Sequence, residues 1–198
     1  MRVTLFDYGA GNLHSLGKAL RGDGRVVHVE ADPARATDTD VLILPGVGAF
    51  GAAAAALAPG RTAMRDAITA GLPTLGICLG MQLMFDSSDE GPGPGLALLP
   101  GRVERLQARR TPQIGWNAIE DASDPLFAPP ALLMAYYANR YVCRPAASAS
   151  VIAWSTHEHD RFPAAVRSGR AVGVQFHPEK SSAPGLAFLQ RFLREAAG

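Results

Sequence analysis

The sequence predicts an α/β fold with a doubly wound, mostly parallel sheet and additional antiparallel or mixed strands in the C-terminal half. Two patterns predict it. Before residue 86, apolar runs typical of buried strands alternate with helix-forming segments, and several of these runs end in glycine-rich turns. After residue 86, short β-type runs separated by turn residues predominate. Such a parallel sheet carries its functional site at the carboxyl ends of its strands.

The expected elements follow from these patterns in chain order. In the first part, strands are expected at residues 3–6, 26–29, 41–44 and 72–77, and helices at 13–20, 52–57, 61–70 and directly after Cys78. In the second part, β-type runs occupy residues 102–106, 114–119, 132–137, 151–155 and 171–176. An amphipathic helix at 186–196 ends the pattern.

Composition sets the outer limits on function. With 198 residues and 47% apolar content, the chain can bury one sizeable core, so we expect residues 1–198 to form a single domain. A net charge of +1 without a long basic block argues against a nucleic-acid partner. The N-terminal apolar run is too short for a signal sequence, so we expect a cytoplasmic protein whose two cysteines are free thiols.

The turn after the first expected strand contains Gly9 and Gly11, which raises the question of nucleotide binding. A dinucleotide-binding turn needs a third glycine and an acidic residue about 20 positions further on. The third glycine is missing, and Glu30 is the one acidic residue in a matching context. We therefore do not expect a dinucleotide site.

Cys78 lies in the turn Gly-Ile-Cys-Leu-Gly at residues 76–80, between an apolar strand and a helix-forming segment. A glycine two positions to either side lets strand and helix approach closely, and a side chain in such a turn projects from the C-terminal edge of the sheet. The thiol thus occupies the position of the serine in a nucleophile elbow. Taken alone, the pattern also fits a buried structural cysteine. Cys78 is the candidate nucleophile, and Cys143 is expected to pack in the core.

A cysteine nucleophile needs a general base and a group that orients this base. Four of the five histidines are expected in a helix, in a strand or in a polar, solvated loop, where structural or surface roles are typical. These four are His14, His28, His157 and His159.

His177 differs because it directly follows the apolar run at 171–176 and precedes Pro178 and Glu179. Proline ends strand pairing, and a spacing of two residues places His177 and Glu179 on one side of an extended backbone. Glu179 can then hold the imidazole as the third member of a triad. A solvated surface turn is the alternative for this tripeptide alone.

A third turn, Pro-Gly-Val-Gly at residues 45–48, supplies donors for a developing negative charge. A tetrahedral intermediate needs backbone N–H groups, and the amide of Leu79 together with a peptide among Gly46, Val47 and Gly48 can provide them. His-x-x-His and Cys-x-x-Cys spacings are absent from the sequence. We therefore expect neither a metal site nor another cofactor.

These motifs together resemble the class I glutamine amidotransferases of the Cys-His-Glu type. The more specific resemblance is to the family of glutaminase subunits of imidazole glycerol phosphate synthase, from histidine biosynthesis. It extends over nearly the whole chain, and the catalytic motifs alone are shared with other amidotransferases. The segments that carry it are residues 7–13 (Asp-Tyr-Gly-Ala-Gly-Asn-Leu), 44–50 (Leu-Pro-Gly-Val-Gly-Ala-Phe), 85–91 (Phe-Asp-Ser-Ser-Asp-Glu-Gly), 114–117 (Ile-Gly-Trp-Asn) and 176–181 (Phe-His-Pro-Glu-Lys-Ser).

The resemblance implies a flavodoxin-like fold and a definite reaction. Cys78 would attack the side-chain amide of L-glutamine, His177 would transfer the proton, and Glu179 would orient His177. A γ-glutamyl thioester would form and be released as glutamate. The ammonia would pass to a separate (β/α)8-barrel cyclase subunit in a heterodimer, which forms imidazole glycerol phosphate and aminoimidazole carboxamide ribotide. Because the chain ends at Gly198, soon after its last expected helix, we expect the cyclase on another polypeptide.

The resemblance also implies roles for residues around the triad. Gly48, Gln82 and Glu90 would bind the substrate glutamine. The peptide of Gly46 and Val47 would complete an oxyanion hole with Leu79 when the partner is loaded. Asn12 and Lys180 would face the cyclase.

The sequence departs from this family at one place. Where the family usually has His-Ser-Tyr near the glutamine site, residues 139–141 are Asn-Arg-Tyr. The positioning of glutamine or the signalling across the interface can therefore differ in this chain.

Three other functions are compatible with parts of the pattern. A glutaminase of anthranilate or pyridoxal phosphate synthesis shares the catalytic motifs, but the Pro-Gly-Val-Gly and Gly-Trp-Asn segments argue against it. A non-catalytic binding module of the same fold would have no use for an intact Cys78, His177 and Glu179. A free-standing γ-glutamyl hydrolase would be highly active without a partner.

Overall fold

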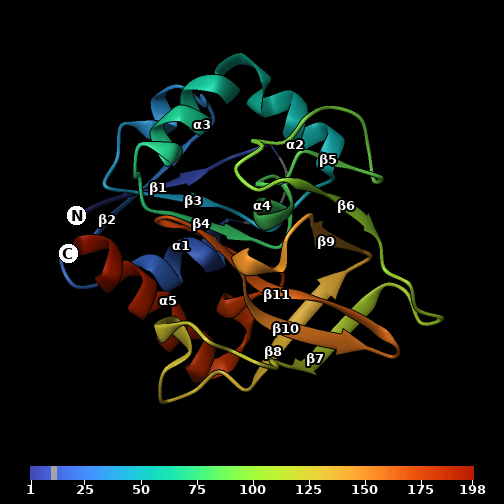
Figure 1. Cartoon of the computed structure of the whole chain (residues 1–198). Coiled ribbons are helices and arrows are strands. Elements are labelled where there is room, and N and C mark those ends of the chain that lie inside the picture. The colour runs from blue at the N-terminus through green and yellow to red at the C-terminus, as the bar shows by residue number, and fades with distance from the viewer. Residues whose placement is uncertain (10–12) are drawn as a thin grey trace.

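The computed structural model describes residues 1–9 and 13–198. Within this part of the chain the central sheet has seven strands (Figure 1). They are β1 (Arg2–Phe6), β2 (Val26–Glu30), β3 (Val41–Leu44), β4 (Thr74–Ile77), β10 (Val151–His157), β11 (Asp160–Ser168) and β12 (Ala171–Val174).

The strand order of this sheet is β10-β11-β12-β4-β3-β1-β2. Strands β2, β1, β3, β4 and β12 pair in parallel, whereas β11 and β10 extend the sheet in antiparallel pairing. The parallel part follows the flavodoxin-like order 2-1-3-4-5, with β12 as its fifth strand. The predicted doubly wound, mostly parallel sheet is confirmed.

Helices cover both faces of the sheet (Figure 1). Within each parallel strand, alternate side chains enter opposite cores: Val3 and Leu5 of β1 pack on one side, and Phe6 packs on the other. The first core includes α1 (His14–Leu20) and α5 (Ser182–Ala197), and the second includes α2 (Phe50–Leu57), α3 (Arg61–Thr69) and α4 (Leu79–Gln82).

The other described strands form two smaller sheets beside the central one, on the right-hand side of Figure 1. One contains β5 (Ser87–Ser88), β6 (Gly101–Arg105) and β9 (Tyr141–Pro145), and the other is an antiparallel pair of β7 (Gln113–Ala118) and β8 (Met134–Asn139). The predicted antiparallel and mixed character of the C-terminal half is therefore confirmed.

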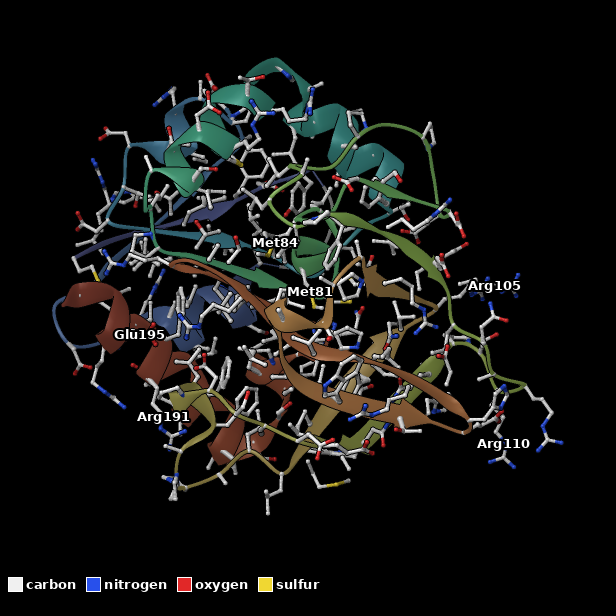
Figure 2. The ribbon with its side chains drawn as sticks, in the orientation of Figure 1. Met81, Met84, Arg105, Arg110, Arg191 and Glu195 are labelled. Atoms are coloured by element: carbon white, nitrogen blue, oxygen red, sulfur yellow. The ribbon has the colours of Figure 1, made fainter. Side chains whose placement is uncertain are left out.

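Helix α4 is shorter than its apolar sequence suggests. It covers one turn after Cys78 and continues as turns in which Met84 N–H donates to the Met81 carbonyl. Both methionines fill the space between α4 and the sheet (Figure 2). A Cβ added to Gly173 of β12 would lie 2.8 Å from Met81 Cγ and 2.9 Å from Met84 Sδ. This packing fixes α4 against the strand that leads to His177.

Other features also differ from the expectations. Strands β5, β9 and β11 were not expected, and residues 157–160, expected as a solvated loop, form the tight end of the β10–β11 hairpin. Asp160 is buried there because its carboxylate pairs with Arg144 and accepts the Gln107 N–H. In the described residues, no helix is long and apolar enough to cross a membrane.

Candidate active site

Cys78 occupies a sharp turn between β4 and α4, as predicted. Its backbone has φ of +48°, which is unusual for a residue with a side chain. Two hydrogen bonds hold this conformation: Cys78 N–H donates to the Val174 carbonyl at 2.7 Å, and Gln82 N–H donates to the Cys78 carbonyl at 3.1 Å. The backbone therefore has the strained strand-to-helix geometry of a nucleophile elbow.

The glycines around Cys78 allow the close approach that the sequence predicted. A Cβ on Gly80 would lie 2.0 Å from the Leu44 carbonyl oxygen, and one on Gly76 would lie 2.6 Å from the Gly80 carbonyl carbon. Side chains at these positions would collide with backbone atoms, which cannot move aside cheaply. The two glycines thus bring α4 against β3 and β4.

His177 lies beyond the end of β12, in a backbone fixed from two sides. Its N–H donates to the Tyr136 carbonyl at 2.8 Å, and its own carbonyl accepts the Ser181 hydroxyl at 2.6 Å. The same hydroxyl oxygen accepts the Tyr136 N–H at 2.9 Å. The side chain of His177 is nearly inaccessible to solvent, with 3% of its surface exposed.

His177 and Glu179 form the predicted pair, with 2.8 Å between Nδ1 and Oε1. The expected reason for the pairing is wrong, because the backbone after His177 forms a 3₁₀ helix (Pro178–Lys180) rather than an extended strand. Proline at the first helical position favours this turn. Strand β12 itself ends at Val174, before residues 175 and 176.

The protonation of His177 depends on Cys78 and Glu179. Burial lowers the pKa of His177, but the hydrogen bonds and negative charges of Cys78 and Glu179 outweigh it and raise this pKa from 6.5 to about 9. At neutral pH the imidazole is therefore protonated and can act as a proton donor. Glu179 Oε2 is buried and accepts no hydrogen bond from the described residues.

The glycine-rich turn after β3 lies against the Cys78–His177 pair. A Cβ on Gly46 would be 2.9 Å from His177 Cε1 and 3.0 Å from Cys78 Cβ. Leu79 is the first residue of α4, so its N–H has no acceptor within that helix. Val47 follows Gly46 and is half-buried. The three predicted oxyanion-hole residues thus belong to the two backbone segments that adjoin the thiol.

Two expected substrate-binding residues, Glu90 and Gln82, are held by hydrogen bonds to other segments. Glu90 Oε2 accepts the Phe50 N–H at 2.9 Å, which holds the carboxylate at the start of α2, two residues after the exposed Gly48. Gln82 is buried in α4, and its Nε2 donates to the Tyr141 carbonyl at 3.1 Å and to Gln175 Oε1 at 3.3 Å.

A cavity of about 320 Å³ adjoins the same turn on the side of α1. Its lining includes Val47, Glu179 and Lys180. Lys180 is exposed, and its Nζ lies 5.9 Å from the centre of the Tyr136 ring. Asn12, the other expected interface residue, lies outside the described residues.

The Asn-Arg-Tyr segment lies at the junction of β8 and β9. Asn139 is buried, its Nδ2 donates to the Tyr141 carbonyl at 3.2 Å, and its Oδ1 has no hydrogen-bond partner among the described residues. Gln113, its neighbour on β7, is also buried, and no described residue hydrogen-bonds its side-chain amide. Arg140 is exposed.

The other histidines belong to other elements of the fold. His14 belongs to α1 and His28 to β2, as expected, and His157 bonds the Arg110 carbonyl through Nε2. Among the described residues, no group of three or more His, Cys, Asp or Glu side chains could hold a metal ion. Cys143 is a free, fully buried thiol, as predicted, and burial raises its pKa well above the usual value.

Sequence reasoning assigned no role to two residues of the site. Ser181 holds the His177 backbone, and Gln175 donates its Nε2–H to Cys78 Sγ at 3.4 Å. Both lie within four residues of His177, so their closeness to the candidate base could be read from the sequence. What was missing was the strand register that brings Gln175 to Cys78.

Known proteins resemble this chain over nearly its full length. The family model of class-I glutamine amidotransferases matches residues 4–196. The imidazole glycerol phosphate synthase subunit HisH of Symbiobacterium thermophilum is 45% identical over 199 residues, covering 98% of this chain and 93% of that protein. The HisH subunit of Thermus thermophilus is 42% identical over 192 residues, covering 96% and 95%.

Solved structures of lower identity share the fold. A chain of PurLQS from Thermotoga maritima has a TM-score of 0.70 at 17% identity, covering 100% of this chain and 99% of that one. A glutamine amidotransferase from Thermotoga maritima has a TM-score of 0.66 at 18% identity, covering 100% and 84%. On the match to the family model and the identity to these relatives, the chain belongs to the class-I glutamine amidotransferases and, among them, to the HisH subunits of imidazole glycerol phosphate synthase.

Proposed function

We propose that this protein is the glutaminase subunit of an imidazole glycerol phosphate synthase in histidine biosynthesis, with Cys78, His177 and Glu179 as its catalytic triad. The observation that carries the assignment of the triad is the convergence of three distant chain segments. A strained turn presents Cys78, a Cβ added to Gly46 would collide with both Cys78 and His177, and Glu179 bonds His177 at 2.8 Å. In a chain of this family, such an arrangement fits hydrolysis of the L-glutamine side-chain amide.

The triad would act in two steps. In the first, the Cys78 thiolate forms a C–S bond with the amide carbon, and the carbonyl electron pair moves onto oxygen. The C–N bond then breaks as the His177 imidazolium gives its proton to the leaving nitrogen, which departs as ammonia and leaves a γ-glutamyl thioester. In the second, His177 takes a proton from water as the water attacks the thioester, and glutamate leaves as the thiolate is restored.

The oxyanion formed in each step needs backbone donors. In this proposal they come from Leu79 and from the Gly46–Val47 peptide. A donor of this kind contributes about 3 kcal/mol to stabilisation of the transition state. Val47 also lines the cavity beside Lys180. A partner that contacts this cavity could therefore control the glutaminase reaction by moving the Gly46–Val47 peptide.

The substrate's amino-acid end would bind between α2 and the Cys78 turn. Glu90 supplies a carboxylate that suits an α-ammonium group, and it is held beside Gly48 by the Phe50 N–H. Gln82 would contribute from α4, the helix that follows Cys78. With these roles for Glu90 and Gln82, the proposed substrate is L-glutamine.

The partner would be a (β/α)8-barrel cyclase on a separate chain, forming a heterodimer. It would use the ammonia to form imidazole glycerol phosphate and aminoimidazole carboxamide ribotide. Supporting this, a surface next to the triad carries exposed apolar side chains: Ile114 is 68% exposed, Trp116 51% and Met134 47%. Exposed apolar patches of this kind mark interaction sites.

This surface, which we call the partner face, is continuous with the active site. Trp116 packs edge-on against Tyr136 with 6.4 Å between ring centres, and Lys180 Nζ lies over the Tyr136 ring. Lys180 in turn lines the cavity together with Val47 and Glu179. A partner seated on these residues, and on Asn12 in our proposal, can therefore influence the oxyanion peptide directly.

We also propose that residues 1–198 act as one amidotransferase domain and that the reaction takes place in the cytoplasm. The family model extends over residues 4–196, and both cores pack on the same central sheet. The free thiols of Cys78 and Cys143 suit a reducing compartment.

The test is glutamate release from glutamine by the protein alone, and then with the cyclase subunit of the same organism and its phosphoribulosyl ligand. Strong stimulation by the loaded cyclase supports a conditional glutaminase and its partner. Equal, high activity in both states would instead indicate an independent hydrolase, and no activity in either state would indicate a binding module.

A further inference from the structure

We propose that Gln175 is a positioning residue that holds the sulfur of Cys78 in its reactive place and favours its thiolate form. Gln175 has a buried side chain, and its Nε2 donates a hydrogen bond to Cys78 Sγ at 3.4 Å. The inference deepens the proposed function and rests on the nucleophilic role given there to Cys78.

The strand register places Gln175 beside Cys78. Strands β4 and β12 pair in parallel from Thr74 opposite Ala171 to Ile77 opposite Val174. Cys78 directly follows β4, and Gln175 directly follows β12. Cys78 N–H continues the ladder by donating to the Val174 carbonyl, and Gln175 N–H donates to the Ala164 carbonyl of β11 at 2.9 Å. Both backbones are therefore fixed at the carboxyl edge of the sheet.

The orientation of the Gln175 amide is fixed by a second glutamine. Gln175 Oε1 accepts a hydrogen bond from Gln82 Nε2, which also donates to the Tyr141 carbonyl. Turning the Gln175 amide over would place Oε1 against the sulfur and Nε2 against another N–H donor. The contact between the Nε2 group of Gln175 and the Gln82 donor would then be repulsive whatever the state of the sulfur, and Oε1 would also repel a thiolate. Gln82 cannot turn over to relieve this, because its Nε2 also donates to the Tyr141 carbonyl, so the observed arrangement directs an N–H group at the sulfur.

A donor at this position stabilises the thiolate more than the thiol, because a charged acceptor binds an N–H group more strongly. The titratable groups that act on Cys78 are His177, with Glu179 behind it, and Cys143 on β9. His177 has a raised pKa and is charged at neutral pH, whereas burial keeps Cys143 neutral. Gln175 is thus a neutral donor to the sulfur, in addition to the charged imidazole.

This arrangement also gives Gln82 a part in the chemistry besides contact with substrate. Both of its described hydrogen bonds run to buried acceptors, one of which is the Gln175 amide. Loss of the Gln82 amide would release Gln175 and reach Cys78 through it. Gln82 therefore acts on the thiol indirectly, through Gln175.

The experiment measures how fast iodoacetamide alkylates Cys78 between pH 5 and pH 10 in a Cys143→Ala background, in the complex with the cyclase. Gln175→Leu removes the hydrogen-bond donor and keeps a side chain of similar volume. Gln175→Glu keeps an acceptor for Gln82 but has no N–H group that could donate to the sulfur. We expect alkylation at pH 7 to slow about tenfold in Gln175→Leu, the effect of one hydrogen bond to a charged group, with the rate at high pH preserved. Gln175→Glu should shift the profile further in the same direction, because it adds a negative charge. In both variants kcat for glutamate release should fall more than KM rises.

Gln113→Leu is the matched control, since it also removes a buried glutamine amide, which lies on β7 and for which the described part of the chain offers no hydrogen-bond partner. Its alkylation profile should equal that of the parent. A parental profile in both Gln175 variants would overturn the inference, and so would an equal shift in Gln113→Leu. If Gln175→Leu does not fold, Gln175→Glu decides alone. Loss of glutaminase activity in Cys78→Ser with unchanged Gln175 profiles would refute only this inference, whereas an active Cys78→Ser would refute the proposed function itself.

Discussion

The backbone of Cys78 has a conformation that costs about 1–3 kcal/mol for a residue with a side chain. The cost is met because Val174 and Gln82 hold the turn through backbone hydrogen bonds and because the flanking glycines admit α4. In return, the thiol is placed at the sheet edge next to His177 and Gly46. The chemistry of the site therefore depends on local strain that the surrounding fold imposes.

The raised pKa of His177 predicts how stability depends on pH. The folded-state pKa of about 9 exceeds the ordinary value of 6.5, so the stabilisation is fully present below pH 6.5 and is lost as the pH rises through about 9. A shift of this size corresponds to about 3 kcal/mol. Urea unfolding from pH 6 to pH 10 should show the stability difference between the parent and His177→Gln shrinking by roughly this amount across the interval.

Cys78→Ala serves as the control for this titration, because Cys78 is one of the two groups that raise the pKa of His177. In that variant the stabilisation should be lost at a lower pH than in the parent. A difference between parent and His177→Gln that does not change between pH 6 and pH 10 would contradict the assigned coupling.

At this scale the sequence was sufficient to select Cys78, His177 and Glu179 as a candidate group, and the structure brings them together. Cys78 and His177 each follow an apolar run, and Glu179 follows His177 at a spacing of two. The sequence was not sufficient for Gln175. The contact between Gln175 and Cys78 joins residues 97 positions apart and depends on the pairing of β4 with β12. The spacing of His177 and Glu179 led to the right pair for the wrong reason, since a 3₁₀ turn brings them together.

At the scale of elements, the approach of α4 to β3 makes Gly80 a sensitive position. A Cβ there would lie 2.0 Å from the Leu44 carbonyl oxygen, inside the backbone of β3. Overpacking against backbone that cannot shift destabilises by about 3 kcal/mol. Gly80→Ala should therefore lower the free energy of unfolding by about that amount or more in urea titrations.

Gly17→Ala provides the comparison. Gly17 lies in α1, and no atom of residues 1–9 or 13–198 lies within 4 Å of a Cβ added there, apart from its own neighbours in the chain and helix. Alanine in a helix interior is favoured over glycine by about 1 kcal/mol, so this variant should be slightly more stable than the parent. Equal stability of the two variants would show that α4 does not approach β3 as closely as described.

Most elements of the first half were predicted within a residue or two, since each has a distinct apolar period. Strand β11 was missed because it begins among polar residues and contains Pro163, which argues against a strand. There, Pro163 pairs with Trp154 next to a register shift, where the ladder is irregular. Helix α4 was expected to be longer because its apolar residues do not reveal where packing on β12 ends it.

At the scale of the whole molecule, the partner face lies away from the β2 edge of the central sheet (Figure 1). Trp116 is large, half-exposed and packed edge-on against Tyr136, which is typical of residues that carry much of a binding energy. Trp116→Ala should weaken binding of the cyclase about thirtyfold, equivalent to about 2 kcal/mol, in a titration of complex formation.

Val29→Ala is the control for a lost exposed apolar side chain. Val29 is 58% exposed and lies on β2. It should leave cyclase binding unchanged. Undiminished binding in Trp116→Ala, or an equal loss in Val29→Ala, would exclude the β7–β8 surface as the partner face.

The order of strands could not be read from the sequence, although the α/β class and the antiparallel second half could. Each strand was recognisable locally, but the insertion of β12 beside β4 is decided by tertiary packing. This one placement brings the His177 segment to Cys78 and creates the site. The resemblance to the family implied an interface role for Lys180, which stays a prediction, whereas the exposure of Ile114, Trp116 and Met134 became evident when β7 and β8 were seen as a pair.

The central claim is that Cys78 releases ammonia from glutamine for a reaction that the partner completes. Its most direct test is synthesis of imidazole glycerol phosphate by the complex containing Cys78→Ser, with either glutamine or ammonium salt as nitrogen source. Cys143→Ser serves as the matched control and should keep both activities. We predict that Cys78→Ser loses glutamine-dependent synthesis and keeps ammonia-dependent synthesis. Retained glutamine-dependent synthesis, or loss of both activities in a folded complex, would contradict the account.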